Sequence, residues 1–220
     1  MTQEIIILDT EYTTWKDAKE NGWSAPGQHR EIVQIAAIQF DLKTGVEKAK
    51  LDILVKPKFN GTLSDLFIEL TSIKQEHVNA KGYSFPDALN KFFTFCQNVP
   101  PENILCFNAD EDVFKENCAL HDIHMPFSTP WKKLRPALPL LGVDVENNSS
   151  GTLHKFTDTP LEGHTHYALH DVRSMGAFLY DQIKKGKHDF FTKLPLEGDP
   201  LVPLNIKKAI ITRMNYNHKL

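Results

Sequence analysis

Four acidic side chains and one histidine, spread over most of the chain, are the residue types that metal-assisted hydrolysis of a phosphodiester requires. They are Asp9, Glu11, Asp110, His166 and Asp171. Carboxylates bind hard divalent ions such as Mg²⁺ or Mn²⁺, and a histidine side chain, which titrates near neutral pH, can take a proton from water. The pattern therefore makes this chain a candidate metal-dependent nuclease.

Asp9 and Glu11 stand two apart, so on a strand their side chains share one face. The apolar, mostly β-branched run 5–8 before them predicts a strand that is buried on both faces. Acids at the end of such a strand form a crowded carboxylate cluster, which repels itself unless cations bind. An ordinary solvated strand end explains the same two acids, and the spacing alone leaves both interpretations open.

The other candidate site residues lie near the N-terminal ends of two predicted helices. Asp110 and Asp112 follow a short predicted strand and open a predicted helix, where the helix macrodipole stabilises acidic residues whether or not they have a catalytic role. His166 is predicted at the mouth of the last long helix and Asp171 one turn inside, so both can point to a common centre. A histidine five before an aspartate is also frequent by chance.

The elements that must position these residues form an α/β pattern. Strands are predicted over 5–8, 32–40, 51–55 and 103–107, and helices over 84–98, 111–120 and 167–183. The segment 41–45 suits a hairpin connection, and the order of elements indicates a mixed sheet. The long polar segment 13–30 contains Trp15 and Trp23, and we interpret it as a flap at the edge of the site.

Composition limits the class of protein. The chain has 220 residues and a net charge of −3, which argues against a protein that coats nucleic acid by charge alone. Residues 184–220 carry eight Lys/Arg against three Asp/Glu, a net +5, which leaves −8 for the rest. We expect a catalytic domain over 1–185 and a basic, proline-containing extension over 186–220.

The expected compartment follows from what the sequence lacks. No apolar run reaches the roughly 18 residues of a membrane span, and the first residues do not have the positive region of a signal peptide. Three cysteines without a CxxC motif indicate reduced thiols that act as small core residues. We therefore predict an intracellular, cytoplasmic protein without a membrane segment.

Together the motifs resemble the DEDD superfamily of 3′-to-5′ exonucleases, in the branch whose fifth catalytic residue is a histidine five before the last aspartate. The matching segments are Leu8-Asp9-Thr10-Glu11-Tyr12-Thr13, Glu31-Ile32-Val33-Gln34-Ile35-Ala36-Ala37, Glu69-Leu70-Thr71-Ser72-Ile73 with Gln75 and Val78, and His166-Tyr167-Ala168-Leu169-His170-Asp171. Within this branch the chain is most similar to exoribonucleases that trim small RNAs and structured RNA 3′ ends. The resemblance covers about residues 5–180 and identifies the expected domain over 1–185 as an exonuclease domain.

The resemblance implies a fold, a ligand set and a reaction. The fold is an RNase H-like mixed β-sheet flanked by helices. The metal ligands of two divalent cations, Mg²⁺ or Mn²⁺, would be Asp9, Glu11, Asp110 and Asp171, with His166 as the general base. Thr10, Tyr12 and Thr71 would bind substrate. The expected partner is the 3′ end of a single-stranded nucleic acid, RNA favoured over DNA, and the products would be nucleoside 5′-monophosphates.

The sequence departs from the family pattern in three places. Asp110 and Asp112 stand where one aspartate is expected, and we favour Asp110 because Asp110, Phe114 and Cys118 keep the family's spacing. Tyr12 is bulkier than the small residue often found after the glutamate. Ser72 replaces the usual glycine.

Two other functions compete with this interpretation. A zinc hydrolase could use His164, His166 and His170, although this leaves Asp9, Glu11 and Asp110 without roles. A non-catalytic nucleic-acid-binding module on an exonuclease fold is the second, and the retention of all five expected side chains argues against it. The chain has no GxxxxGK[ST] phosphate loop, so a P-loop nucleotidase has little support.

Overall fold

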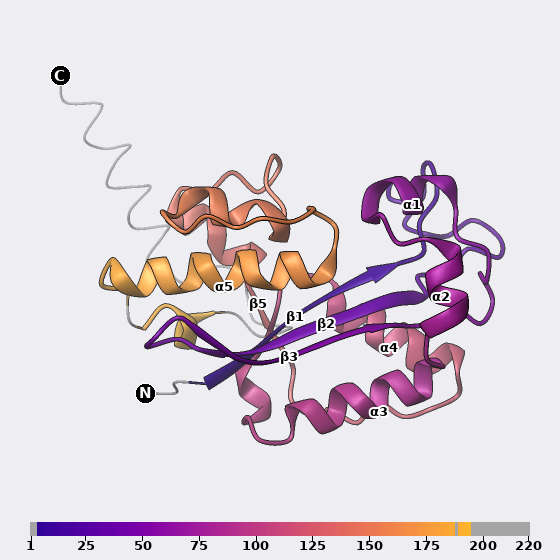
Figure 1. Ribbon diagram of the computed structural model, residues 1–220, viewed down its shortest axis with the longest axis horizontal. Helices are drawn as coiled ribbons and strands as arrows, with labels where there is room; N and C mark the ends of the chain where they lie inside the picture. Colours follow the sequence, from indigo (N-terminus) through magenta and orange to yellow (C-terminus); the bar gives the residue numbers. More distant parts are fainter. Residues whose placement is uncertain (1–3, 188, 195–220) are drawn as a thin grey trace, which may run out of the picture.

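A five-stranded mixed sheet, with strand order β3-β2-β1-β4-β5, runs through the middle of the protein (Figure 1). The computed structural model describes residues 4–187 and 189–194. The strands are β1 (Glu4–Tyr12), β2 (Ile32–Asp41), β3 (Val46–Leu54), β4 (Ile104–Cys106) and β5 (Lys132–Lys133). The β1–β2 and β2–β3 pairs are antiparallel, whereas the β1–β4 and β4–β5 pairs are parallel. This arrangement confirms the predicted mixed sheet.

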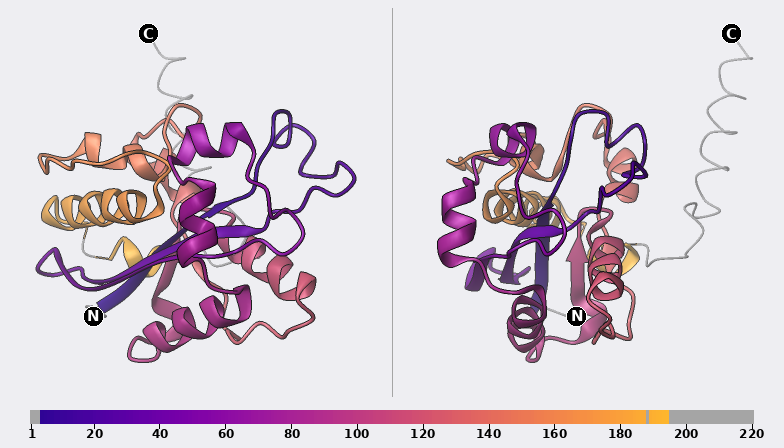
Figure 2. Two further views of the ribbon diagram at one scale, coloured as in Figure 1. Left: turned by 45° about the vertical axis from the view of Figure 1, so that its right-hand side comes forward. Right: turned by 90° about the vertical axis from the view of Figure 1, so that its right-hand side faces the viewer.

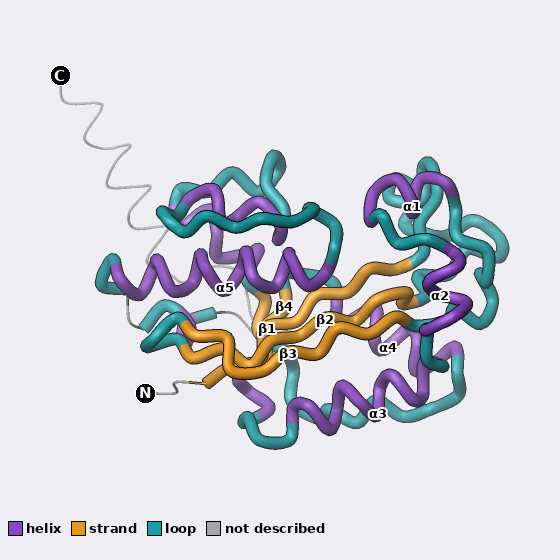
Figure 3. Tube along the Cα trace, in the orientation of Figure 1, coloured by secondary structure: helices purple, strands orange, loops and turns teal. Residues whose placement is uncertain are grey.

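Helices cover both faces of the sheet. The α-helices are α1 (Asp65–Thr71), α2 (Gln75–Lys81), α3 (Phe85–Cys96), α4 (Asp110–Leu120) and α5 (Ala168–Lys184), and the 3₁₀ helices are η1 (Pro101–Asn103), η2 (Arg135–Leu141), η3 (Ser150–Phe156) and η4 (Phe191–Lys193). Helix α5 lies on one face, and α3 and α4 lie on the other (Figure 1). Helices α1 and α2 lie at the end of the sheet where β1 terminates (Figure 3).

The central strand β1 is buried on both faces, as its apolar run predicts. Ile5 and Ile7 pack in the cluster that includes residues of α5, whereas Ile6 and Leu8 pack in the cluster that includes residues of α3 and α4. All four side chains are fully buried. Because side chains alternate along a strand, the same alternation sends Asp9 toward the α5 face of the sheet.

Predicted and observed boundaries differ in a few places. Strand β3 begins at residue 46 rather than 51, because the predicted hairpin is tight: the Asp41 carboxylate accepts hydrogen bonds from the backbone N–H groups of Lys43 (2.9 Å) and Thr44 (3.2 Å), and Gly45 has φ 71°. Helix α4 begins one residue earlier than predicted, at Asp110. Strand β5 was not predicted, because two residues are too few to show a period of two.

The cysteines behave as small core residues. Cys96, Cys106 and Cys118 are buried and form no disulfide. Burial raises the pKa of the Cys96 thiol to about 12 and that of Cys118 to about 11. Unreactive core thiols, rather than nucleophiles, are what these shifts indicate.

The predicted extension from residue 186 is described only in part. Phe191 and Leu194 are buried against the cluster that contains α5. Residues 188 and 195–220 lie outside the described part of the chain, so the boundary at 185 stays a prediction. Among the described helices, none combines the length and the apolar character needed to cross a bilayer.

Candidate active site

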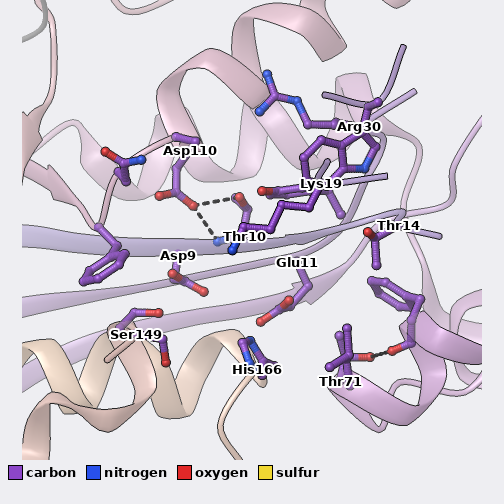
Figure 4. Close-up of a pocket in the computed structure, with 18 of the residues that line it drawn as sticks. Asp9, Thr10, Glu11, Thr14, Lys19, Arg30, Thr71, Asp110, Ser149 and His166 are labelled. Atoms are coloured by element: carbon purple, nitrogen blue, oxygen red, sulfur yellow. Dashed lines mark hydrogen bonds between the residues drawn. The ribbon is translucent and has the colours of Figure 1, made fainter. Parts of the chain in front are cut away.

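A cavity of about 700 Å³ opens at the end of β1 and is lined by all eight residues predicted for the site (Figure 4). They are Asp9, Thr10, Glu11, Tyr12, Thr71, Asp110, His166 and Asp171. Residues from β1, α1, α4 and α5 therefore meet at one place. We call the carboxylates Asp9, Glu11, Asp110 and Asp171 the floor of this cavity.

Three of these side chains form a compact group of possible metal ligands. One ligand atom each from Glu11, His166 and Asp171 lie within 4.8 Å of one another. The backbone N–H of His166 donates to Asp171 Oδ1 at 3.3 Å, and His166 has φ 69°, a left-handed conformation that is uncommon for a residue with a side chain. The turn before α5 thus holds the exposed His166 ring beside the floor.

The floor carboxylates repel one another in a buried setting. Burial raises the pKa of Asp9 well above its ordinary value, and the neighbouring charges of Asp110, Asp171 and Glu11 raise it further. Burial and the charges of Asp171 and Asp110 likewise raise the pKa of Glu11. Oxygen ligands that repel one another are a donor set for hard divalent cations, so these residues fit such ions.

Asp110 and Asp112 point to different surroundings. Asp110 Oδ1 accepts hydrogen bonds from the backbone N–H of Thr10 (2.9 Å) and from its hydroxyl (2.8 Å), shown as dashed lines in Figure 4. Burial raises the pKa of Asp110, and the Thr10 hydrogen bonds oppose that rise. Asp112 instead lies 3.5 Å from Lys133 Nζ, with 40% of its side chain exposed. Of the two, Asp110 lines the cavity.

Two residues beside Asp171 were missed at the level of sequence. The Ser150 hydroxyl donates to Asp171 Oδ2 at 2.8 Å. Gly151 lies so close that a Cβ atom there would be 2.3 Å from Asp171 Oδ1. Both belong to η3, which packs on α5. Residues this far from Asp171 in the chain, and without a recognisable motif, leave no signal in a single sequence.

The described residues do not form the three-histidine zinc site. His166 faces Glu11 and Asp171, whereas His170 is buried with its Nε2 3.1 Å from the Gly151 carbonyl oxygen. The His170 ring packs against His154, with ring centroids 5.3 Å apart, and His164 is exposed. The zinc-hydrolase alternative therefore loses its ligand set.

The residues predicted to bind substrate differ in whether their polar groups already have hydrogen-bond partners within the protein. The buried Thr71 hydroxyl donates to the Phe67 carbonyl oxygen (2.9 Å) and accepts from the Ile73 N–H (3.0 Å), so it is engaged within the α1 turn. Burial raises the pKa of Tyr12 to about 12, and its ring packs edge-on against Trp23. Ser72 ends α1 with φ 61°, the left-handed conformation that glycine adopts most easily.

Comparison with known proteins decides the family. Residues 6–178 match the family model of the exonucleases, RNase_T. The chain belongs to the exonuclease family. This confirms the family resemblance found in the sequence motifs, and membership implies divalent metal ions as cofactors.

Relatives and solved structures agree with the exonuclease family. ERI1 exoribonuclease 2 of Mus musculus is 23% identical over 205 residues, which cover 83% of this chain and 29% of the mouse protein. The nuclease domain of 3′hExo, a DEDDh family member bound to rAMP, superposes with a TM-score of 0.72 at 20% identity, over 89% of this chain and 96% of that one. A 3′-exonuclease described in 3′-end-specific recognition of a histone mRNA stem-loop has a TM-score of 0.71 at 20% identity, over 84% and 83%.

These comparisons bear on the fold and on the family. The two superpositions confirm the predicted α/β fold of DEDD exonucleases. This chain spans less than a third of the length of the mouse relative.

Proposed function

We propose that this chain is a divalent-metal-dependent 3′-to-5′ exonuclease that removes nucleotides from the 3′ end of RNA. The observation that carries the proposal is the convergence of the four floor carboxylates and His166 in one cavity of an exonuclease-family fold. RNA is favoured because the mouse relative is an exoribonuclease and two solved structures of similar fold are described with rAMP and with a histone mRNA stem-loop.

In this proposal the floor holds two divalent ions, Mg²⁺ or Mn²⁺. Its members are Asp9, Glu11, Asp110 and Asp171. Ions bound there would stabilise the negative charge of the scissile phosphate and of the leaving 3′-oxygen. The pKa values of Asp9 and Glu11, raised first by burial and then by neighbouring carboxylates, support the proposal, because bound cations would stabilise the ionised forms. Thr10 positions Asp110, and Ser150 positions Asp171, each through a hydrogen bond to a carboxylate oxygen.

His166 is the proposed general base. Its ring takes a proton from the attacking water while the water oxygen bonds to phosphorus and the bond from phosphorus to the 3′-oxygen breaks. The leaving 3′-oxygen takes up a proton from solvent, so the products are a nucleoside 5′-monophosphate and a strand one residue shorter with a new 3′-hydroxyl. The exposed position of His166 lets it release the proton to solvent between turnovers.

A cleavage assay tests the proposal. A 5′-labelled single-stranded RNA should shorten stepwise from its 3′ end in Mg²⁺ or Mn²⁺, and chromatography should detect nucleoside 5′-monophosphates. DNA of the same sequence tests whether the sugar matters, and an RNA with a blocked 3′ end should remain intact. Absence of shortening, or equal activity in Asp9→Ala, would contradict the proposal; RNA binding without shortening would support the non-catalytic module instead.

We also propose a cytoplasmic location and a basic extension beyond a catalytic domain formed by residues 1–185. The three unpaired, buried cysteines support a reducing compartment. The family match, which ends at residue 178, supports the domain boundary. A chain truncated after Leu194 should retain metal-dependent cleavage, and a fluorescent fusion should report the compartment.

A further inference from the structure

The cavity extends beyond the floor to the loop that joins β1 and β2. Residues 13–31 form this loop, which projects past the end of the sheet beside α1 (Figure 2). Its cavity-lining members include the cations Lys16, Lys19 and Arg30 and the aromatic residues Trp15 and Trp23. The proposed cleavage chemistry uses none of them.

The loop is held in one shape despite its length. At its base, the Thr13 N–H donates to the Glu31 carbonyl oxygen at 2.9 Å, and the Glu31 N–H donates to the Thr13 hydroxyl at 3.0 Å. In the middle, Ala18 is only 1% exposed and its carbonyl oxygen accepts from the Trp23 N–H at 2.8 Å. The Trp23 indole N–H returns to the Thr13 carbonyl oxygen at 3.0 Å. The loop therefore forms a wall of the cavity whose backbone is held by these hydrogen bonds.

Arg30 connects this wall to α4 through an ion pair with Glu116. Its Nε donates to Glu116 Oε2 at 2.8 Å, and a second nitrogen donates to the other carboxylate oxygen. Its Cζ lies 5.9 Å from the Tyr12 ring centroid and 5.6 Å from that of Trp23. The Arg30 charge is thus neutralised by Glu116 on α4.

Of the loop's cations, Lys16 and Lys19 remain to meet a ligand; Arg135, a cation that lines the cavity from η2, lies 3.4 Å from Glu146. Both lysines are exposed, and neither forms an ion pair with another described residue. The Lys19 side chain extends from the loop into the cavity (Figure 4). Asp17 and Glu20 of the same loop also line the cavity, so the loop is not a general basic patch. Because these two acids offset the charge of the two lysines, the lysines can attract an anion only through direct contact and not through a net positive charge of the loop.

Backbone phosphates of a bound strand are the anions that these two lysines could bind. Two divalent ions match the four carboxylates of the floor, so every additional phosphate of a bound strand brings uncompensated negative charge. Ammonium groups cannot ligate a metal ion, and they form charge-assisted hydrogen bonds with phosphate oxygens.

We propose that Lys16 and Lys19 form a subsite for backbone phosphates of the strand beyond the scissile phosphodiester. The inference rests on the proposed function and adds that the enzyme recognises more than its terminal nucleotide. On single strands, each phosphate contact contributes about 0.7 to the slope of log affinity against log salt concentration. Loss of both contacts should therefore lower that slope by about 1.4.

The experiment compares a long substrate with one that has a single phosphodiester. The long substrate is a 12-nucleotide RNA, and the short one is a nucleoside 5′-monophosphate 4-nitrophenyl ester. In Lys16→Gln/Lys19→Gln, the KM for RNA should rise roughly tenfold relative to the KM for the ester, with kcat on RNA nearly retained. The matched control, Lys43→Gln/Lys50→Gln, makes the same charge change at exposed positions outside the cavity lining and should behave as the wild type.

Two outcomes would overturn the subsite. One is an unchanged KM ratio and salt slope in the Lys16/Lys19 variant. The other is an equal effect in the Lys43/Lys50 control, which would show that net charge alone matters. Equilibrium binding of the RNA in a His166→Ala background measures the same salt slope without cleavage. The subsite and the proposed function can therefore fail separately.

Discussion

The floor of the cavity and its loop wall contrast in charge and in burial. Asp9, Asp110 and Asp171 are 7%, 6% and 1% exposed and come from the central strand and from two helices packed on it. Lys16 and Lys19 are exposed and come from a connecting loop. The floor therefore concentrates negative charge in a desolvated place, whereas the wall presents positive charge to water.

Because of this difference, we expect substitutions in the floor to change catalysis and stability, and substitutions in the wall to change substrate affinity. A buried charge interacts strongly with its neighbours, so a change in the floor alters the reaction and the stability of the fold together. An exposed charge is screened, so a change in the wall alters affinity by a modest factor. Substitutions made in one region at a time test whether the floor and the wall have these separate roles.

The largest effect is expected for His166→Ala. Removal of the proposed base should lower kcat on RNA by about 10²–10⁴-fold, the range typical of general acid–base catalysis. Metal binding should persist, since the floor carboxylates remain, and the thermal stabilisation by Mn²⁺ should be close to that of the wild type. Single-turnover cleavage and thermal scans measure the two effects. Loss of the Mn²⁺ response would identify His166 as a metal ligand instead.

The next effect separates Asp110 from Asp112. Asp110→Asn keeps the shape of the side chain but removes one floor charge, so kcat should fall about a hundredfold or more. Asp112→Asn weakens only a partly exposed pair with Lys133, and kcat should stay within about twofold. Steady-state cleavage of the same RNA compares the two proteins. The reverse order of effects would make Asp112 the ligand.

A smaller effect concerns stability and pH. The folded-state pKa of Asp9 lies above its ordinary value of 3.8, because burial and neighbouring carboxylates disfavour the ionised form. The folded state therefore binds the proton more tightly, and stability is lost as pH rises from 3.8 through the raised pKa and regained as pH falls. Without metal at pH 7.5, Asp9→Asn should unfold at a higher temperature than the wild type, by about 2–4 °C per kcal/mol of repulsion removed.

Metal addition completes the same test. At pH 7.5, Mg²⁺ or Mn²⁺ should raise the Tm of the wild type, and it should raise that of Asp9→Asn less, because one floor ligand has lost its charge. Differential scanning calorimetry with and without metal gives all four values. A wild-type Tm that does not respond to either metal would show that the floor does not bind these ions.

The smallest effect is expected at Ser72, the C-cap residue of α1. Ser72 has φ 61°, and Ser72→Gly should raise the free energy of unfolding by about 0.5–1 kcal/mol by relieving the left-handed strain. Ala80→Gly, at an exposed position within α2, should lower it by a similar amount. Urea denaturation measures both changes. A destabilised Ser72→Gly protein would show that the serine side chain contributes more than the strain costs.

Patterns among residues a few positions apart in the chain predicted the central strand and the preference for Asp110. The apolar run before Asp9 specifies a central strand, and alternation along that strand explains why Asp9 and Thr10 meet different helices. The spacing from Asp110 to Phe114 and Cys118 favoured the aspartate that the structure places in the cavity. In each case the relevant neighbours are a few residues apart, so helical or strand geometry converts spacing directly into direction.

Contacts between distant segments could not be predicted in the same way. The support of Asp171 by Ser150 and Gly151, the attachment of Arg30 to Glu116, and the short strand β5 all depend on packing between elements far apart in the chain. No periodicity in a single sequence encodes such a pairing, because the side chains involved are ordinary for a loop or a helix surface.

The sequence by itself determined the class of fold, the family and the residues that could form the floor, since these follow from local patterns and ordered motifs. Only the tertiary structure decided that those residues converge on one cavity, that Asp112 faces Lys133, and that Lys19 extends into the cavity. The physical reason is that burial and electrostatic coupling depend on distances across the fold, and those distances exist only once β1, α4, α5 and the loop between β1 and β2 are packed together.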